Sequence, residues 1–261
     1  MNSAPRLFEK IYATVYTGIR DASPLKQKIF HWSMGIGKQY GDLVLAGIQP
    51  GALLTFKRKI AEKLVLHKVH GLFGTNFHHL NYGGAPLNPE IEKFFFYCGV
   101  LVTGGYGLTE TSPVLAMNGP HCFKFGSVGP AAPLVDIRID PDTGEIQAKG
   151  PNIMQGYWRD EEGTKAILQN GWLHTGDLAR RDSNVYYKIT GRIKDMIIRG
   201  GENIYPKEIE DFIYTNPKVK DVQVIGVPDK QYGEEIMACI ILKDGVTMTS
   251  DEIKEYIRSH M

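Results

Sequence analysis

The chain has 261 residues, a formal net charge of +1 and 43% hydrophobic residues, so it has enough apolar material for a folded core. The balanced charge excludes the overall basic bias of many nucleic-acid-binding proteins, and we expect no nucleic-acid partner. Three widely spaced cysteines, Cys98, Cys122 and Cys239, indicate reduced thiols rather than a disulfide framework. No run approaches the ~18 apolar residues of a membrane span, and no signal-peptide core is present, so we expect a cytoplasmic location.

One local asymmetry lies in the first sixty residues, where basic residues outnumber acidic ones. The basic residues are Arg6, Lys10, Arg20, Lys26, Lys28, Lys38, Lys57, Arg58 and Lys59. Solvated helix faces explain the pattern most simply, because Lys and Arg mostly lie at the surface. A membrane-surface patch is the alternative, and it predicts peripheral membrane association.

The first eighty residues carry apolar side chains at helical spacing. The predicted helices span residues 5–20, 25–40 and 56–69. The strand-like segment LNYGGAPL, residues 80–87, ends in a Gly-Gly-Ala-Pro run that interrupts regular structure. A helix is predicted from Pro89, and the apolar run 100–102 predicts a strand, with no parallel neighbour recognised upstream. This alternation is typical of α/β architecture.

The second half of the chain changes pattern twice. Short alternating runs between residues 126 and 187 predict a small antiparallel region. From about Arg192 the pattern predicts a strand, a glycine turn and a helix with Pro206 at its first position. Two further strands follow, and a capping box from Thr249 to Glu252 begins a last helix.

The run GGYGLTET, residues 104–111, predicts a glycine-rich turn whose backbone lets a ligand approach closely. Tyr106 offers a flat ring on which a base could stack, and Thr109 and Thr111 offer hydroxyl donors. A bare carboxylate at Glu110 would repel phosphate unless it holds Mg²⁺, which bridges carboxylate and phosphate oxygens. By itself the run is equally typical of a structural turn.

A second set of candidates lies further along the chain. Asp177, after a glycine in GWLHTGDL, is placed to accept hydrogen bonds from both hydroxyls of a ribose, and an Asx turn is the alternative. In GRIKDMIIRGGENIYP, Arg192 could bind hydroxyls or phosphate, and Gly200 with Gly201 could accommodate a ligand. Solvated hairpin charges are the alternative for that segment.

Four histidines, His67, His70, His78 and His79, are close in sequence. Their spacing lacks an accompanying Cys or acidic ligand set, so a metal site there is not predicted. Neither a nucleophile elbow nor a Walker sequence is present, which disfavours a hydrolase or a P-loop enzyme.

These segments occur together in an order that resembles the acyl-adenylate-forming superfamily, which includes acyl-CoA synthetases, coumarate ligases and luciferases. The matching segments are GGAPL, GYGLTETSP, GEIQAKGPNIMQGYW, GWLHTGDLARRD and GRIKDMIIRGGENIYPKEIE. The early segments APRLFEKIY and SPLKQKIFHWSMGIGKQY are similar to long-chain fatty acyl-CoA synthetases in particular. The resemblance covers essentially the whole chain.

The resemblance implies an α/β fold in two parts. Residues 1–191 would form the C-terminal half of the large AMP-binding domain, with a parallel sheet and a small antiparallel β region. Residues 192–261 would form a smaller, incomplete α+β C-terminal domain. It also implies a reaction between a fatty acid, ATP and coenzyme A through an acyl-adenylate, with AMP and pyrophosphate as products and magnesium as cofactor.

Residue roles follow from the resemblance position by position. Gly84, Ala85 and Pro86 would line the adenine and acyl pocket, Gly105, Tyr106 and Gly107 would flank the base, Thr109 would contact phosphate and Glu110 the magnesium ion. Asp177 and Arg192 would take the ribose hydroxyls, Lys194 would lie at the hinge, and Gly200 and Gly201 near the pantetheine path.

Three departures from the family pattern are visible. The Ser/Thr/Gly-rich phosphate loop ending in Pro-Lys-Gly and the terminal catalytic lysine are absent from the 261 residues. Asn184 and Val185 occupy a turn that usually carries glycine. We therefore expect a fragment that is nearly inactive alone, and the missing N-terminal half of the fold is a candidate partner.

Two other functions stay open from sequence alone. One is a non-catalytic module that binds AMP or an acyl-adenylate. The other is a relative that adenylates a carrier-protein substrate or an amino acid, which the fatty-acid-like early segments disfavour.

Overall fold

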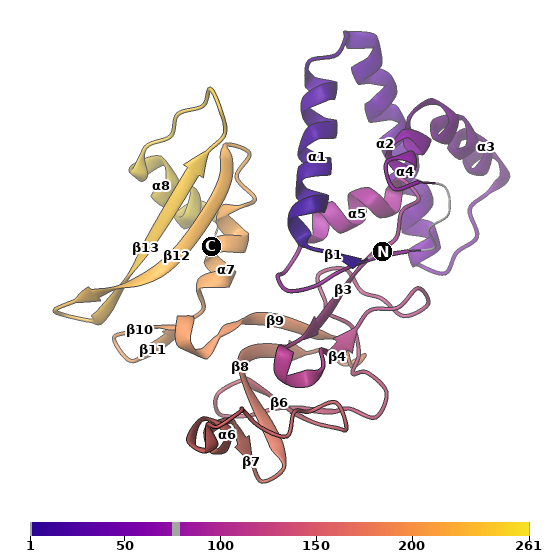
Figure 1. Cartoon of the computed structure of the whole chain (residues 1–261). Coiled ribbons are helices and arrows are strands. Elements are labelled where there is room, and N and C mark those ends of the chain that lie inside the picture. The colour runs from indigo at the N-terminus through magenta and orange to yellow at the C-terminus, as the bar shows by residue number, and fades with distance from the viewer. Residues whose placement is uncertain (1, 75–78, 261) are drawn as a thin grey trace. The chain divides into compact units, whose positions relative to one another are not determined.

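The structure, a computed structural model, describes residues 2–74 and 79–260 (Figure 1). The chain divides into two compact units, each with its own hydrophobic core. The first unit comprises Met1–Asp136, Gly150–Gln155 and Asp182–Lys188, and the second comprises Ile137–Lys149, Gly156–Arg181 and Ile189–Met261. This division follows packing and does not test the predicted domain boundary between residues 191 and 192, which stays a prediction.

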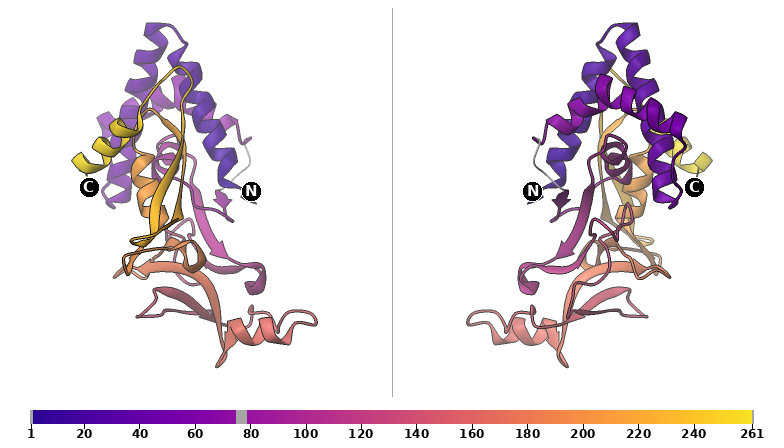
Figure 2. Two further views of the ribbon diagram at one scale, coloured as in Figure 1. Left: turned by 90° about the vertical axis from the view of Figure 1, so that its left-hand side faces the viewer. Right: turned by 90° about the vertical axis from the view of Figure 1, so that its right-hand side faces the viewer.

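The first unit begins with helices. They are α1 (Pro5–Arg20), α2 (Pro24–Leu45), α3 (Ala52–Ala61), a π-helical turn (Glu62–Leu66) and α4 (His67–Gly71). Helices α1 and α2 lie side by side as an antiparallel pair (Figures 1 and 2). The three predicted helical regions are confirmed, with two differences. The second helix is longer than predicted, and the third is divided by the π-helical turn.

A four-stranded sheet in the order β1-β2-β3-β4 completes the first unit. β1 (Asn2–Ser3), β2 (Leu80–Tyr82) and β3 (Val102–Gly107) run parallel, and β4 (Val114–Met117) pairs with β3 antiparallel. The expectation that β3 has no upstream parallel neighbour was wrong. A two-residue and a three-residue strand are too short to show a period in the sequence.

Helix α5 (Pro89–Tyr97) supplies much of the first core. The Asn88 side chain caps the helix by accepting a hydrogen bond from the Glu90 amide at 2.8 Å. The ring of Phe95 in this helix meets the ring of Phe8 in α1 edge to face, with the ring centroids 5.7 Å apart. Burying one such ring contributes roughly 1.5–3 kcal/mol, so aromatic burial holds α5 against α1.

Two further sheets lie mostly in the second unit. The first has the order β5-β6-β8-β7 with β9 paired to β8, and its strands are β5 (Asp136–Ile139), β6 (Glu145–Lys149), β7 (Leu168–Gln169), β8 (Trp172–Arg181) and β9 (Tyr187–Arg192). Helix α6 (Glu161–Ile167) precedes β7. The pairs β6–β8 and β7–β8 are antiparallel, which confirms the predicted antiparallel region.

The second sheet has the order β11-β10-β13-β12. Its strands are β10 (Ile197–Arg199), β11 (Glu202–Ile204), β12 (Val219–Asp229) and β13 (Gly233–Leu242), with helices α7 (Pro206–Ile213) and α8 (Ser250–His260). The capping box is confirmed: the Thr249 amide donates to Glu252 Oε2 at 2.7 Å, and the Glu252 amide donates to Thr249 Oγ1 at 3.3 Å.

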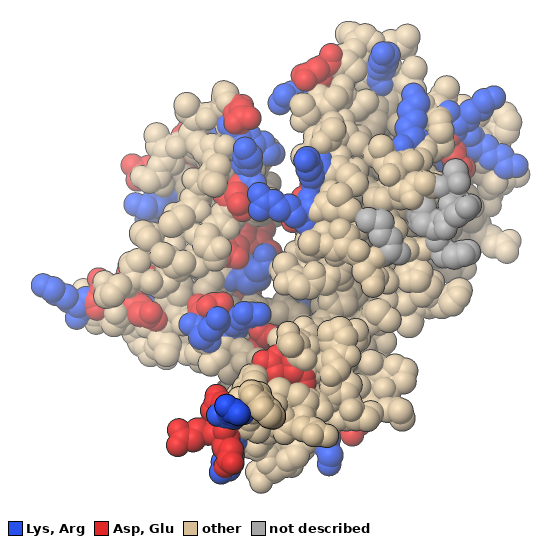
Figure 3. Space-filling view, in the orientation of Figure 1, with Lys and Arg blue, Asp and Glu red and all other residues tan. Residues whose placement is uncertain are grey.

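The basic residues of the first sixty are partly engaged within the chain. Lys38 pairs with Asp42 at 2.5 Å, and Arg58 donates to the Tyr97 carbonyl. On the face shown in Figure 3, some basic side chains stand singly near the top, and others gather at the upper right, over the region of α3 in Figure 1. Within residues 2–74 and 79–260, no helix is long and apolar enough to span a bilayer. Peripheral membrane association and a cytoplasmic location stay predictions.

Candidate functional site

The glycines of GGYG lie in the extended strand β3, not in the predicted turn. A Cβ at Gly104 would lie 2.6 Å from the Tyr82 hydroxyl oxygen, and a Cβ at Gly107 would lie 1.6 Å from the Pro113 carbonyl oxygen. At Gly105 the nearest heavy atom would be 3.5 Å away, an ordinary contact. The first and last glycines are therefore required by packing within the chain. A ligand is not needed to explain them.

Tyr106 lies between these glycines and is half-buried, with its backbone in register with Ala116 of β4. Thr109 is exposed and Glu110 is half-buried in the short 3-10 turn that follows β3 (Thr109–Thr111). The predicted roles of all three side chains stay predictions. Their positions leave Thr109 and Glu110 accessible at one end of a buried strand.

Thr111, predicted as a ligand donor, serves the turn itself. Its buried hydroxyl accepts a hydrogen bond from the Leu108 amide at 2.9 Å and donates to the Pro113 carbonyl at 2.6 Å. The Asn152 side chain donates to the Thr111 carbonyl at 2.9 Å and to the Val114 carbonyl at 2.8 Å. The side chains of Thr111 and Asn152 thus hold the turn that carries Glu110.

The GGAPL segment follows β2 in the same unit. Gly84, Ala85 and Pro86 are exposed, and Gly84 has a φ of +82°, in the left-handed region where glycine is favoured. Leu87 is buried in the core and fixes the end of the segment. The structure therefore brings this segment and the β3 glycines together in one unit, because β2 and β3 are neighbours.

Asp177 and Arg192, both predicted to bind ribose, form an ion pair in the second unit. Arg192 Nε donates to Asp177 Oδ1 at 2.9 Å, and the Asp177 side chain is 6% exposed while that of Arg192 is 52% exposed. The pairing orients the buried carboxylate. The half-exposed guanidinium remains accessible to a ligand.

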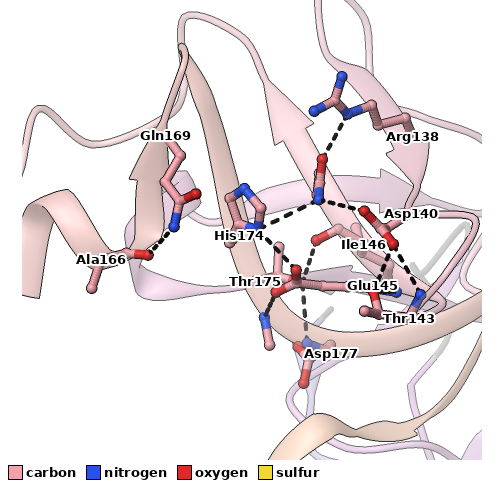
Figure 4. A network of polar contacts seen from close by, with 12 residues as sticks. Arg138, Asp140, Thr143, Glu145, Ile146, Ala166, Gln169, His174, Thr175 and Asp177 are labelled. Atoms are coloured by element: carbon pink, nitrogen blue, oxygen red, sulfur yellow. Dashed lines mark hydrogen bonds and ion pairs between the residues drawn. The ribbon is translucent and has the colours of Figure 1, made fainter.

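A polar network supports the segment just before Asp177 (Figure 4). Glu145 is buried in β6, and its carboxylate accepts from the Gly176 amide at 2.8 Å and from His174 Nδ1 at 2.9 Å. Gly176 has a φ of +71°, which strongly favours glycine at this position. Thr175 donates to a β6 carbonyl at 2.8 Å and accepts from the Asp177 amide at 3.2 Å. Together these contacts fix the backbone that carries the ribose candidate.

The other candidates of the second unit lie just after β9. Lys194 is in the 3-10 turn Ile193–Asp195. Gly200 and Gly201 form the hairpin turn between β10 and β11 with φ of +59° and +86°, and this two-residue turn requires glycine for backbone reasons. Their predicted place near pantetheine, and the predicted hinge at Lys194, stay predictions.

Among the described residues of the histidine group, His67, His70 and His79 are not gathered into a metal-binding cluster. His67 Nδ1 lies 2.8 Å from the Glu62 carbonyl oxygen, and His78 lies outside the described residues. In the part of the chain that the structure describes, no three His, Cys, Asp or Glu side chains are grouped to hold a metal ion.

Comparison with known proteins gives the family. The pattern described as AMP-binding enzyme matches residues 1–158, and the pattern described as AMP-binding enzyme C-terminal domain matches residues 208–261. The chain belongs to the AMP-binding enzyme family. This confirms the superfamily that the sequence motifs resemble, while the long-chain branch stays a prediction.

Individual relatives of this AMP-binding enzyme agree with that assignment. The mitochondrial medium-chain acyl-CoA ligase ACSF2 of Danio rerio is 44% identical over 191 residues, covering 67% of this chain and 32% of the relative. The ATP-bound structure of MatB from Rhodopseudomonas palustris is 36% identical with a TM-score of 0.67, covering 70% of this chain and 39% of MatB. The MenE o-succinylbenzoate CoA synthetase of Bacillus subtilis, in complex with the acyl-adenylate intermediate OSB-AMP, is 29% identical with a TM-score of 0.65, covering 84% of this chain and 50% of MenE.

These matches confirm the predicted adenylate-forming α/β fold. The chain spans 32–41% of the length of the first curated relatives it matches. Its candidate residues are divided between the two units: those from Gly84 to Glu110 belong to the first, and those from Asp177 to Gly201 belong to the second.

Sequence reasoning missed the residues that support these candidates in the AMP-binding enzyme. Asn152, Glu145 and His174 hold the backbone near Glu110 and Asp177, yet none was singled out. All three lie within the motif segments themselves. In the sequence each is one polar residue in a β-rich segment. Its role becomes visible only from its hydrogen-bond partners in the fold.

Proposed function

We propose that the chain carries part of the site of an ATP-dependent acid–CoA ligase. In the first half-reaction a carboxylate oxygen of the acid attacks the α-phosphorus of ATP, and the bond to the β-phosphate oxygen breaks to release pyrophosphate. In the second, the sulfur of coenzyme A attacks the acyl carbon, and AMP leaves. The likeness to ATP-bound MatB and to MenE with its acyl-adenylate supports this sequence of steps.

The first unit would bind the base and the phosphates. Tyr106 would stack on the adenine, with Gly105 beside it as the glycine that packing leaves free, and the exposed Thr109 hydroxyl would donate to a phosphate oxygen. The exposed Gly84–Pro86 segment would border the adenine and the acyl group. Glu110 would hold Mg²⁺ together with phosphate oxygens, and a carboxylate beside a hydroxyl fits this hard cation, which would neutralise the charge of the leaving pyrophosphate.

Asp177 and Arg192, both in the second unit, would bind the ribose, and the smaller C-terminal domain from residue 192 would rotate between half-reactions. Asp177 would accept hydrogen bonds from the ribose hydroxyls, and Arg192 would both orient that carboxylate and donate to the sugar. Lys194 would act as the hinge residue, and the Gly200–Gly201 turn would lie near the pantetheine arm. The ion pair between Asp177 and Arg192 is the single observation that carries this part, since a buried acid is held where a sugar-binding acid is expected.

We propose a long-chain fatty acid as the acid substrate. The segments APRLFEKIY and SPLKQKIFHWSMGIGKQY, which form α1 and α2, support it. Titration with non-hydrolysable hexanoyl, decanoyl and palmitoyl adenylates would test the assignment. The palmitoyl adenylate should bind most tightly, and tightest binding of the hexanoyl compound would refute the long-chain assignment.

The 261-residue chain should release pyrophosphate only at background rate when ATP, fatty acid and coenzyme A are supplied. The phosphate loop and the terminal lysine of the family pattern are not among its residues, and each missing electrostatic donor commonly costs ~3 kcal/mol of transition-state stabilisation. Pyrophosphate release well above background would overturn this expectation.

A module that binds AMP without turnover is the second candidate, since the AMP-binding enzyme pattern matches residues 1–158 while the phosphate loop and terminal lysine are not among the 261 residues. Calorimetric titration with AMP distinguishes the two cases. Saturable heat without turnover indicates a folded binding module. No saturable heat indicates an incomplete site that needs the rest of the fold, with the missing N-terminal half as its partner.

A further inference from the structure

Glu92 is a buried acid that none of the proposed binding steps uses. It lies on α5 with 1% of its surface exposed. Its Oε1 accepts a hydrogen bond from the Tyr82 hydroxyl at 2.8 Å, and its Oε2 accepts from the Gly126 amide at 2.6 Å. Both carboxylate oxygens are therefore occupied, and the acid joins the end of β2 to a loop far along the chain.

The Tyr82 hydroxyl is the centre of these contacts. Besides donating to Glu92, it lies near the backbone of Leu87, the last residue of GGAPL. Tyr82 is also in register with Gly104 of β3, where an added Cβ would lie 2.6 Å from the hydroxyl oxygen. One hydroxyl thus touches both segments that are proposed to surround the adenine.

A second group of buried hydrogen bonds, made by Asn118 and Ser127, also holds Gly104. The Asn118 amide donates to the Gly104 carbonyl at 3.0 Å, and the Asn118 side chain donates to the Ser127 carbonyl at 2.7 Å. Ser127 directly follows Gly126, which donates to Glu92. The loop at 126–127 therefore connects the acid to β3 by a second route, independent of Tyr82.

We propose that Glu92 is a positioning residue, which acts through the Tyr82 hydroxyl and the Gly126 amide to hold GGAPL and the β3 glycines at the spacing that nucleotide binding requires. The proposal rests on the proposed function for its binding role. The groups that act on the acid are Tyr82 from β2, the Gly126 amide and the neighbouring Lys93 of α5. Burial raises the pKa of Glu92 to about 7, so its charge changes near neutral pH.

The protonation state matters because the ionised acid only accepts hydrogen bonds. Two donors, one hydroxyl and one amide, face its two oxygens. When the acid is protonated, one oxygen becomes a donor, and the Tyr82 hydroxyl must accept instead of donating for that contact to persist. Because burial favours the neutral acid, ionisation near pH 7 should loosen these contacts, so the spacing of the two segments should depend on pH.

The test compares the whole chain with Glu92→Gln, Tyr82→Phe and the control Glu90→Gln. Glu90 lies on the same helix, is exposed, and its carboxylate pairs with Lys93 at 2.7 Å. Amide hydrogen exchange, corrected for its chemical pH dependence, is followed at residues 83–87 and 104–107, with β12 and β13 as internal reference. AMP affinity is measured by calorimetry on the same samples.

Exchange at both segments should accelerate about tenfold or more in Tyr82→Phe and should change with pH through about 7 in the unaltered chain but not in Glu92→Gln. Glu90→Gln should behave like the unaltered chain. Unchanged exchange in both Glu92→Gln and Tyr82→Phe would overturn the proposal. If the unaltered chain shows no AMP heat, the 261 residues do not bind AMP by themselves, while exchange still decides whether Glu92 positions these segments. Because glutamine keeps the size of glutamate, Glu92→Gln remains informative if Tyr82→Phe does not fold.

Discussion

Tyr82 and Gly104 face each other across the parallel β2–β3 pair, and the tyrosine hydroxyl occupies the space that a side chain at residue 104 would need. Gly104 is thus a glycine for reasons of internal packing. The adjacent Gly105 has no neighbour closer than 3.5 Å to an added Cβ. Internal packing therefore explains the glycine at residue 104 but not the glycine at residue 105.

Replacing Gly104 by alanine should lower the free energy of unfolding by roughly 1–3 kcal/mol, because the new methyl group overlaps the Tyr82 ring and hydroxyl. Gly105→Ala is the matched control and should change stability much less. Urea unfolding followed by circular dichroism measures both. Equal losses in the two variants would contradict the packing argument.

Glu92 should make stability depend on pH. Its ordinary pKa of 4.5 is raised to about 7 in the folded chain by burial, so between these values the folded chain holds a proton that the unfolded chain has released. The free energy of unfolding should therefore fall by up to about 3 kcal/mol as the pH rises from 4.5 to 7.

Urea unfolding at several pH values measures this dependence. Glu92→Gln should lose the Glu92 contribution, so its stability should fall less over the same pH range. Glu90→Gln should retain the dependence of the unaltered chain. If Glu92→Gln and Glu90→Gln gave the same pH profile, Glu92 would not be the responsible group.

Removing the guanidinium at Arg192 should weaken both stability and nucleotide binding. Asp177 is 6% exposed and would lose the partner of its charge, which costs roughly 1–3 kcal/mol. AMP affinity should fall at least about tenfold, corresponding to the loss of one charged hydrogen bond. Arg180→Ala is the control, because Arg180 pairs with Glu208 at the surface with 73% exposure and should matter little. A similar loss in both variants would show that the Asp177 contact has no special weight.

Replacing Val185 by glycine should stabilise the folded chain. Its φ is +62°, a region that β-branched residues rarely adopt, and it lies in a turn that the Asp182 side chain holds by accepting from the Asn184 and Tyr186 amides at 2.9 Å each. Val185→Gly should raise the free energy of unfolding by about 1 kcal/mol, since the steric penalty exceeds the entropy cost of glycine. Asn184→Gly, at a residue without positive φ, should not stabilise the chain. Thermal unfolding of the two variants decides the point, and a destabilised Val185→Gly would count against the strain.

Much of the local structure was predictable because it depends on neighbouring residues. Three features follow from short-range rules and are confirmed: the helix from Pro89, the glycine turn followed by the helix that begins at Pro206, and the Thr249–Glu252 capping box. The glycine turn at residues 104–107 was predicted wrongly. Several glycines in a row usually signal a turn. Here Tyr82 requires glycine at residue 104 and Pro113 requires it at residue 107, and neither is adjacent in the sequence to the glycine it contacts.

By itself, the sequence determined the family, the α/β class and the order of the candidate residues, because ordered motifs and short-range preferences are written along the chain. Only the tertiary structure decided that Asp177 and Arg192 pair, that the Thr111 hydroxyl serves its own turn and that buried Glu92 accepts from Tyr82. The physical reason is that hydrogen bonding and burial depend on distances between residues that folding brings together. Glu92 and Gly126 are 34 positions apart in sequence, and their 2.6 Å contact exists only in the fold.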